Sequence, residues 1–212
     1  MFDSRIRPLI DPITDAIGRG VSRVGITANM MTIIGGVMGV GAFIAISQSA
    51  YMAGLVLILL NRLADGLDGA VARHQGASDF GGFIDIVFDF IFYALVPLGF
   101  ALADPGNAVA ACFLVVSFIG TGSSFLAFAI MAEKRGLSTA IRGHKSLYYL
   151  GGLTEGAETI AVLVLMCLMP HWFIPLAWGF GALCWLTTAS RVWWGWESFG
   201  KNTKEKNTED TE

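Results

Sequence analysis

Residues 65–89 read DGLDGAVARHQGASDFGGFIDIVFD, and four of the five aspartates in this stretch fall within segments that otherwise resemble membrane spans: Asp65, Asp68, Asp85 and Asp89. An ionised aspartate near the centre of a bilayer costs about 2.5–3.5 kcal/mol even on the more lenient insertion scale. Four of them would make this stretch a poor membrane span unless a cation neutralised them. Carboxylate oxygens are the ligands that Mg²⁺ and Mn²⁺ prefer. The stretch therefore predicts a divalent-metal site inside a membrane protein.

The composition of the whole chain is that of a membrane protein. Apolar residues make up 54% of the sequence and charged residues 15%, whereas a soluble domain carries about 25% charge. A helix needs about 20 apolar residues to span a bilayer. Six such spans are predicted, at residues 30–47, 51–71, 80–101, 108–131, 159–169 extended backward through 150, and 172–194. We therefore expect an all-α membrane protein with one bundle of six transmembrane helices.

The basic residues predict the orientation of the bundle. Lysine and arginine gather before the first span, after the second, between the fourth and fifth, and after the sixth. The alternate connections, at residues 48–50, 104–107 and 170–172, contain none. Cytoplasmic loops carry the excess of basic residues. Both termini are therefore expected in the cytoplasm, as an even number of spans requires.

The regions that flank the bundle differ from it in character. Residues 1–24 are predicted to form an amphipathic helix on the cytoplasmic membrane surface, because apolar residues recur there at helical spacing. These apolar residues are Ile6, Leu9, Ile10, Ile13 and Ile17. The alternative is a frayed polar leader. Residues 25–197 should form the transmembrane domain, and the charged residues 198–212 a disordered cytoplasmic tail.

The spacing of the four aspartates predicts how they meet. Asp65 and Asp68 are three residues apart and Asp85 and Asp89 are four apart, so each pair shares a helix face. A turn around residues 73–79 would make the second and third spans an antiparallel hairpin, with the two acidic faces opposed. Small residues near the acids would allow close helix approach or leave room for a flat ligand: Gly66, Gly69, Ala70, Ala72, Gly81 and Gly82.

A family resemblance rests on the same residues. The pattern D-x2-D-G-x2-A-R-x7-G-x3-D-x3-D is carried by Asp65, Asp68, Gly69, Ala72, Arg73, Gly81, Asp85 and Asp89. This arrangement resembles the signature of the CDP-alcohol phosphatidyltransferases at every fixed position, which makes the match highly specific. Residues 25–32, GITANMMT, are also similar to the family's sequence at the start of the first span, with Ala28 where proline is usual.

The resemblance implies an enzyme of phospholipid biosynthesis. Such an enzyme transfers a phosphatidyl group from CDP-diacylglycerol, or a related CDP-lipid, to a small alcohol and releases CMP. It also implies a homodimer in the lipid of the bacterial cytoplasmic membrane, and no nucleic acid partner is expected. The acceptor is left open by the sequence: glycerol phosphate, inositol phosphate, serine and a lipid alcohol are all compatible with it.

The resemblance further implies roles for individual residues. Mg²⁺ or Mn²⁺, two ions per site, would be bound by Asp65, Asp68 and Asp85. Asp89 would be the catalytic general base and would share a metal ion. The nucleotide pocket would include Asp68, Gly69, Ala72, Arg73 and Gly81.

Arg62 offers a different explanation of the acids. It lies three residues before Asp65 on the same helix face and could pair with Asp65 and Asp68. One arginine cannot neutralise four carboxylates, however. We therefore expect Arg62 to orient one of the aspartates from behind the metal ligands.

The connection between the fourth and fifth spans is the predicted acceptor site. Basic and aromatic residues precede acids that enter an apolar span, where acids usually serve a function. The predicted acceptor contacts are His144, Lys145, Tyr148, Glu155 and Glu158, with Ser123, Ser124 and Arg191 as further candidates. The alternative is a solvated cytoplasmic loop with ordinary inside charges.

Two other classes of protein could use intramembrane carboxylates. A transporter or proton-relay protein would distribute its acids across the bilayer on several helices, whereas here they cluster on one predicted hairpin beside glycines. A non-catalytic scaffold would gain nothing from four acids that are costly to insert. The sequence therefore favours the transferase.

Overall fold

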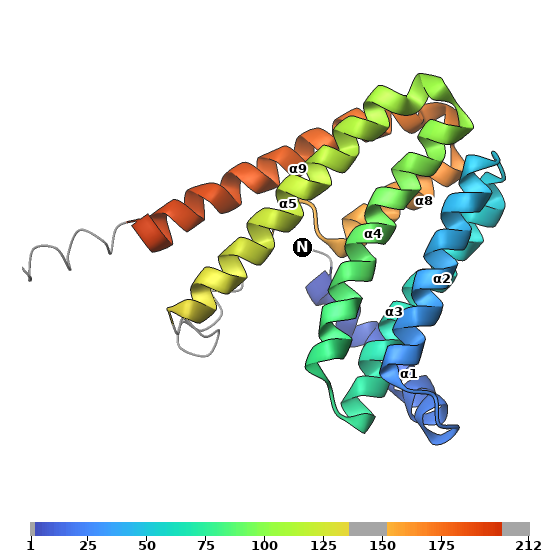
Figure 1. Cartoon of the computed structure of the whole chain (residues 1–212), viewed down its shortest axis with the longest axis vertical. Coiled ribbons are helices and arrows are strands. Elements are labelled where there is room, and N and C mark those ends of the chain that lie inside the picture. Colours follow the sequence, from blue (N-terminus) through green and yellow to red (C-terminus); the bar gives the residue numbers. More distant parts are fainter. Residues whose placement is uncertain (1–2, 136–151, 201–212) are drawn as a thin grey trace, which may run out of the picture.

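The computed structural model describes residues 3–135 and 152–200, and every regular element in those ranges is helical (Figure 1). The long helices are α1 (Asp3–Arg23), α2 (Ala28–Ser47), α3 (Tyr51–Gln75), α4 (Asp79–Ala103), α5 (Ala108–Lys134), α8 (Gly156–Leu168) and α9 (Phe173–Gly195). Short 3-10 turns at Pro105–Asn107 and Pro170–Trp172 join α4 to α5 and α8 to α9, and a π-helical turn at Trp196–Gly200 follows α9.

The helices form two groups. α2, α3 and α4 lie side by side with α1 at one end, and α5 lies against α9 (Figure 1). α4 packs on α5 and α3 packs on α8, which joins the groups. A continuous apolar core crosses the junction, where the rings of Phe100 and Phe173 stack with centroids 4.5 Å apart. This junction packs the hairpin of α3 and α4 against the rest of the bundle.

Four stretches of the described chain are long and apolar enough to cross a membrane: Ala28–Ser47, Asp79–Ala103, Pro105–Lys134 and Pro170–Gly200. α3 has 25 residues but carries Arg62, Asp65, Asp68 and Arg73. α8 is apolar but has only 13 residues. The predicted all-α membrane fold is thus confirmed, while the number of six spans stays a prediction.

The predicted fifth span begins too early. Residues 152–155 are not helical, and α8 starts at Gly156. The reason is a capping box: Glu155 occupies the N-cap position, and its backbone N–H donates to Oε2 of Glu158 at 3.2 Å. Gly152 lies so close to Thr187 on α9 that a Cβ there would overlap its side chain. The prediction that the helix extends backward through residue 150 is therefore wrong for residues 152–155.

The predicted N-terminal helix is present as α1, which packs on α3. Gly18 makes this crossing close, since a Cβ at that position would lie 2.8 Å from the Cβ of Ala70. Asp15 on α1 also forms an ion pair with Arg73 on α3, with 2.6 Å between Oδ1 and Nη2. α1 is therefore attached to the helix that carries Asp65 and Asp68. Its position on the membrane surface stays a prediction.

Candidate active site

The hairpin of α3 and α4 turns within residues 76–78, inside the range that the sequence predicts. Gly76 ends α3 with a φ of 97°, a conformation that favours glycine. Ser78 then begins α4 as its N-cap, and its Oγ accepts the backbone N–H of Gly81 at 3.0 Å. This tight turn makes the helices antiparallel and opposes their acidic faces.

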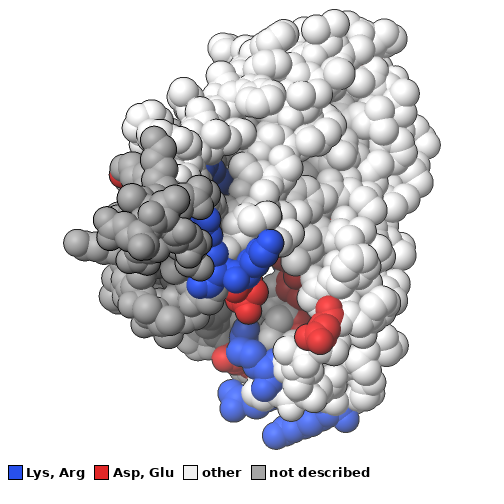
Figure 2. Space-filling view, turned by 60° about the vertical axis from the view of Figure 1, so that its left-hand side comes forward, with Lys and Arg blue, Asp and Glu red and all other residues white. Residues whose placement is uncertain are grey.

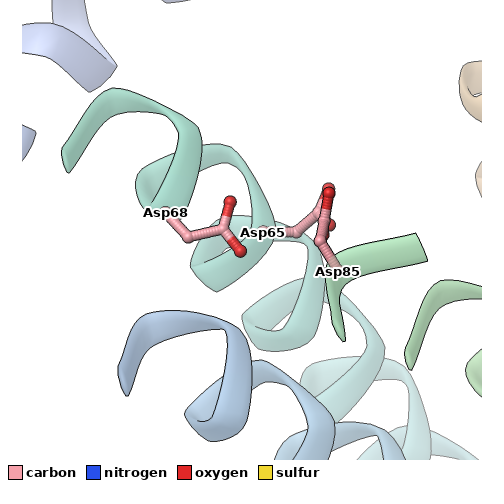
Figure 3. Close-up of side chains that lie close together, drawn as sticks. All are labelled: Asp65, Asp68 and Asp85. Carbon is pink, nitrogen blue, oxygen red and sulfur yellow. The ribbon is translucent and has the colours of Figure 1, made fainter. Parts of the chain in front are cut away.

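Three of the four aspartates meet across the hairpin. Asp65 and Asp68 from α3 and Asp85 from α4 each offer a carboxylate oxygen, and these oxygens all lie within 4.8 Å of one another (Figure 3). Asp68 is buried, and the other two are partly buried. Three like charges this close repel one another unless a cation lies between them. An all-carboxylate donor set fits Mg²⁺ or Mn²⁺, as the sequence predicts.

A third helix holds the buried acid of this cluster. Thr32 on α2 donates its hydroxyl to Oδ2 of Asp68 at 2.7 Å. The same oxygen, Thr32 Oγ1, lies 3.1 Å from the backbone oxygen of Ala28. This role of Thr32 was not predicted from the sequence. The signal was available, because Thr32 closes the stretch 25–32 that resembles the family's first span.

Asp89 stands apart from the cluster, one helical turn beyond Asp85. Its Oδ1 is bound by Nη2 of Arg62 at 2.8 Å. Nη1 of the same guanidinium lies 3.5 Å from Oδ2 of Asp65. The expectation that Arg62 orients an aspartate thus has a geometric basis. The two acids that it pairs with are Asp89 and Asp65, rather than Asp65 and Asp68.

A cavity of about 330 Å³ opens beside the acid cluster. Its lining includes Asp68 and Asp85 from the cluster together with residues of α2, α3, α4 and the hairpin turn: Thr27, Ala28, Asn29, Thr32, Gly69, Ala72, Gln75, Gly76, Ala77, Ser78, Gly81 and Gly82. Figure 2 shows acidic side chains in a hollow with basic side chains around it, on a described surface that is otherwise mostly uncharged. Cavity and acid cluster are therefore one continuous site.

Most of the predicted nucleotide contacts line this cavity. Asp68, Gly69, Ala72 and Gly81 are among its walls. Gly81 must be small, since a Cβ there would lie 2.7 Å from Oδ1 of Asn29. Arg73 is not part of the lining, and both its Nε and Nη2 bind Oδ1 of Asp15. The other polar residues of the lining were not predicted to be part of the site: Thr27, Asn29, Gln75 and Ser78.

The structure describes only two of the five main predicted acceptor residues. His144, Lys145 and Tyr148 lie outside the described residues. Glu155 and Glu158 are described, and together they cap the start of α8. Their contact with an acceptor stays a prediction. Ser123 and Ser124 donate their hydroxyls to backbone oxygens of their own helix.

Arg191 is the buried cation of the second helix group, with only 8% of the residue exposed. Its Nη1 donates to the backbone oxygen of Thr121 on α5 at 2.8 Å, and its Cζ lies 5.5 Å from the ring centroid of Phe125. Phe90 of α4, the neighbour of Asp89, packs directly on Gly122 of α5. Arg191 therefore binds the part of α5 that contacts the acid-bearing helix.

Comparison with known proteins identifies the family. A family model described as CDP-alcohol phosphatidyltransferase matches residues 25–193. The chain belongs to this family. The CDP-alcohol phosphatidyltransferases are enzymes, and the resemblance seen in the acidic signature is thereby confirmed. The transporter and scaffold alternatives are set aside.

Relatives and solved structures agree with this assignment. The inner membrane protein YnjF of Escherichia coli is 53% identical over 197 residues, which covers 92% of this chain and 96% of that protein. The structure of the phosphatidylinositol phosphate synthase of Mycobacterium tuberculosis with CDP-DAG bound matches with a TM-score of 0.69 at 25% identity, over 87% of this chain and 94% of that one. The same enzyme in complex with manganese and citrate gives a TM-score of 0.58 at 28% identity, over 84% and 83%. This chain is thus a membrane transferase that moves a phosphatidyl group from a CDP-linked lipid to an alcohol.

Proposed function

We propose that this phosphatidyltransferase uses CDP-diacylglycerol as donor and a phosphorylated polyol as acceptor. One observation carries the proposal: Asp68 and Asp85 belong both to the acid cluster and to the wall of the 330 Å³ cavity. A nucleotide in that cavity would bring its diphosphate to the carboxylates. Four acids would repel a diphosphate, so the arrangement is productive only with a cation between them.

The donor set of the cluster supports a role for divalent cations. Asp65, Asp68 and Asp85 would hold a tightly bound Mg²⁺ or Mn²⁺, and a second, more weakly bound ion would have to share Asp89 with Arg62. Bound ions would neutralise the diphosphate and the charge that develops on the departing CMP. The solved relative that binds manganese and citrate supports this assignment.

Asp89 is assigned as the general base. Arg62 binds its Oδ1, so we assign Oδ2 as the atom that accepts the proton of the acceptor hydroxyl. The hydroxyl oxygen then forms a bond to the phosphorus that carries the diacylglycerol. The bond from that phosphorus to the bridging oxygen breaks, and CMP leaves with the electron pair. One proton moves to Asp89 and one phosphatidyl group moves to the acceptor.

Two observations support a phosphorylated acceptor. One related enzyme of known structure, from Mycobacterium tuberculosis, is a phosphatidylinositol phosphate synthase. In this chain, the buried Arg191 supplies a planar cation of the kind that binds phosphate groups well. Because α5 links Arg191 to Phe90, the neighbour of Asp89, we assign Arg191 to the acceptor side of the site.

The test is CMP release by the purified protein in lipid nanodiscs with CDP-diacylglycerol and Mn²⁺. Inositol phosphate and glycerol phosphate should support release, whereas serine and unphosphorylated inositol should not. Arg191→Gln should raise KM for the phosphorylated acceptor, and Arg135→Gln, at the exposed end of α5, should not. CMP release with serine or inositol alone would overturn the acceptor assignment. No release with any alcohol would overturn the donor assignment.

We also propose a bacterial cytoplasmic membrane location with both termini in the cytoplasm, and a homodimer. The distribution of Lys and Arg supports the orientation, and the relative named as an inner membrane protein supports the location. Reporter fusions at each terminus test the orientation. The mass of the protein in nanodiscs tests the dimer.

A further inference from the structure

Arg62 places a positively charged side chain inside the acidic site. It sits on α3 one turn before Asp65, and only 16% of its side chain is exposed. One Nη atom binds Asp89 at 2.8 Å, and the other lies 3.5 Å from Asp65. Arg62 therefore lies between the acid that stands apart and the cluster of three.

Residues of α3 and α4 contact the guanidinium, and α2 supports it through Asn61. Its Nε donates to Oδ1 of Asn61 at 2.7 Å, and Asn61 in turn donates from Nδ2 to the backbone oxygen of Gly35 on α2 at 2.8 Å. On α4, the ring centroid of Phe92 lies 4.5 Å from Arg62 Cζ, and the Tyr93 hydroxyl lies 3.5 Å from Nη1. Because these contacts fix the position of its guanidinium, Arg62 is a structural part of the site.

The asymmetry of the four acids follows from this placement. The carboxylates of Asp65, Asp68 and Asp85 face one another, whereas that of Asp89 faces a fixed positive charge. A cation that approached Asp89 would have to displace Arg62 or share the carboxylate with it. Among the other three acids, Arg62 forms an ion pair with Asp65, at the longer distance of 3.5 Å, so a cation there does not have to displace it.

We propose that Arg62 is a positioning residue that divides the four aspartates into a tight cation site and a proton acceptor. Asp65, Asp68 and Asp85 form the tight site. Arg62 holds Asp89 out of that site by its ion pair and keeps Asp89 at the place where it serves as base. The assignment of the base rests on the proposed function, but the division of the acids does not.

Binding of Mn²⁺ to the purified full-length protein tests the division directly. Arg62→Gln frees the Asp89 carboxylate to join the ion, so total Mn²⁺ affinity should rise by about tenfold or more, as expected when one more negative charge lies a few ångströms from the ion. The gain should disappear in the double variant Arg62→Gln/Asp89→Asn, because Arg62 acts through Asp89. Arg135→Gln, which removes an exposed arginine directly after the end of α5, should leave Mn²⁺ affinity unchanged.

Thermal unfolding in the absence of metal gives a second readout. Arg62→Gln leaves four acids without their cation and should lower Tm, and Asp89→Asn in the same chain should recover part of the loss. If Arg62→Gln does not fold, Arg62→Lys keeps a positive charge a few ångströms from Asp89 and should bind Mn²⁺ with an affinity within about threefold of that of the wild type.

Two results would overturn the proposal: equal Mn²⁺ affinity in the wild type and in Arg62→Gln, or a gain that persists in the double variant. For Arg62→Lys, a tenfold gain in Mn²⁺ affinity would overturn it as well. If no form of the protein binds Mn²⁺, the proposed metal dependence fails. The role of Arg62 is then tested by the Tm values measured without metal. If the double variant Arg62→Gln/Asp89→Asn has no higher Tm than Arg62→Gln, the proposed role of Arg62 is overturned.

Discussion

The hydroxyl of Thr32 on α2 is joined to Oδ2 of Asp68 on α3 by a buried hydrogen bond of 2.7 Å. Asp68 is the one member of the acid cluster that is fully buried, and it also lines the cavity. A hydrogen bond from α2 therefore orients the carboxylate that both the cation and the nucleotide would use.

Replacing this hydroxyl should weaken cation binding. Thr32→Val keeps the shape of the side chain but removes a hydrogen bond to a charged group, which is worth about 1.5–3 kcal/mol. We expect the Mn²⁺ concentration for half-maximal CMP release to rise by about tenfold. Thr32→Ser keeps the hydroxyl and should remain near the wild type. An unchanged Mn²⁺ dependence in Thr32→Val would show that Thr32 does not orient Asp68.

Gly69 and Gly66 form a matched pair for testing the cavity. Both are exposed glycines of α3, and a Cβ would meet nothing within 4 Å at Gly66 and only an arginine side chain at 3.8 Å at Gly69. Gly69 lines the cavity and Gly66 does not. Both alanine variants should gain about 0.5–1 kcal/mol of helix stability. Only Gly69→Ala should raise KM for the CDP-lipid, and equal KM values in the two variants would place the nucleotide elsewhere.

Removal of divalent cations should destabilise the protein as well as stop turnover. A cation at a concentration of about 100 times its Kd stabilises the folded state by about 2.7 kcal/mol. Addition of EDTA should therefore lower Tm, and excess Mn²⁺ should restore it. Asp85→Asn lacks a ligand from α4 and should show a much smaller Tm shift. A Tm that EDTA leaves unchanged in the wild type would contradict a cation at the acid cluster.

Asp89→Asn should separate catalysis from binding. Loss of a general base typically lowers a rate by about 10²–10⁴-fold, whereas the three acids of the cluster remain. We expect CMP release to fall in that range while the protein still binds the CDP-lipid and Mn²⁺. Asp104→Asn, in the loop where Asp104 caps the backbone N–H of Gly106, is the control. Turnover of Asp89→Asn close to that of the wild type would exclude Asp89 as the base.

Much of this architecture could be predicted because local signals agree with one another. Gly76 and Ser78 mark the turn between two apolar runs, so the hairpin and the meeting of Asp65, Asp68 and Asp85 follow from spacing alone. The fifth span is predicted to start earlier than α8 does, because a bilayer span needs about 20 residues and residues 159–169 alone are too few. Acids at the first turn of a helix also serve as caps, and in the structure they do.

Contacts between distant parts of the chain could not be predicted from spacing. Arg73 was expected at the nucleotide, yet it binds Asp15, 58 residues earlier. Arg62 was expected to orient one of the aspartates, and spacing offered Asp65 and Asp68 on its own helix, yet its shorter ion pair is with Asp89 on α4. Each of these partners lies on another helix, and only the packing of the helices decides which acid a long arginine side chain reaches.

The close crossing at Gly18 has a practical consequence. At Gly18 the backbone of α1 lies directly against Ala70 of α3, because glycine has no side chain to separate them. Gln75 at the end of α3 also donates hydrogen bonds to Ser22 and to the backbone oxygen of Ile26. Deleting the first two dozen residues would therefore strip one wall from the helix that bears Asp65 and Asp68. An N-terminal truncation made to aid purification should cost the protein its activity along with its first helix.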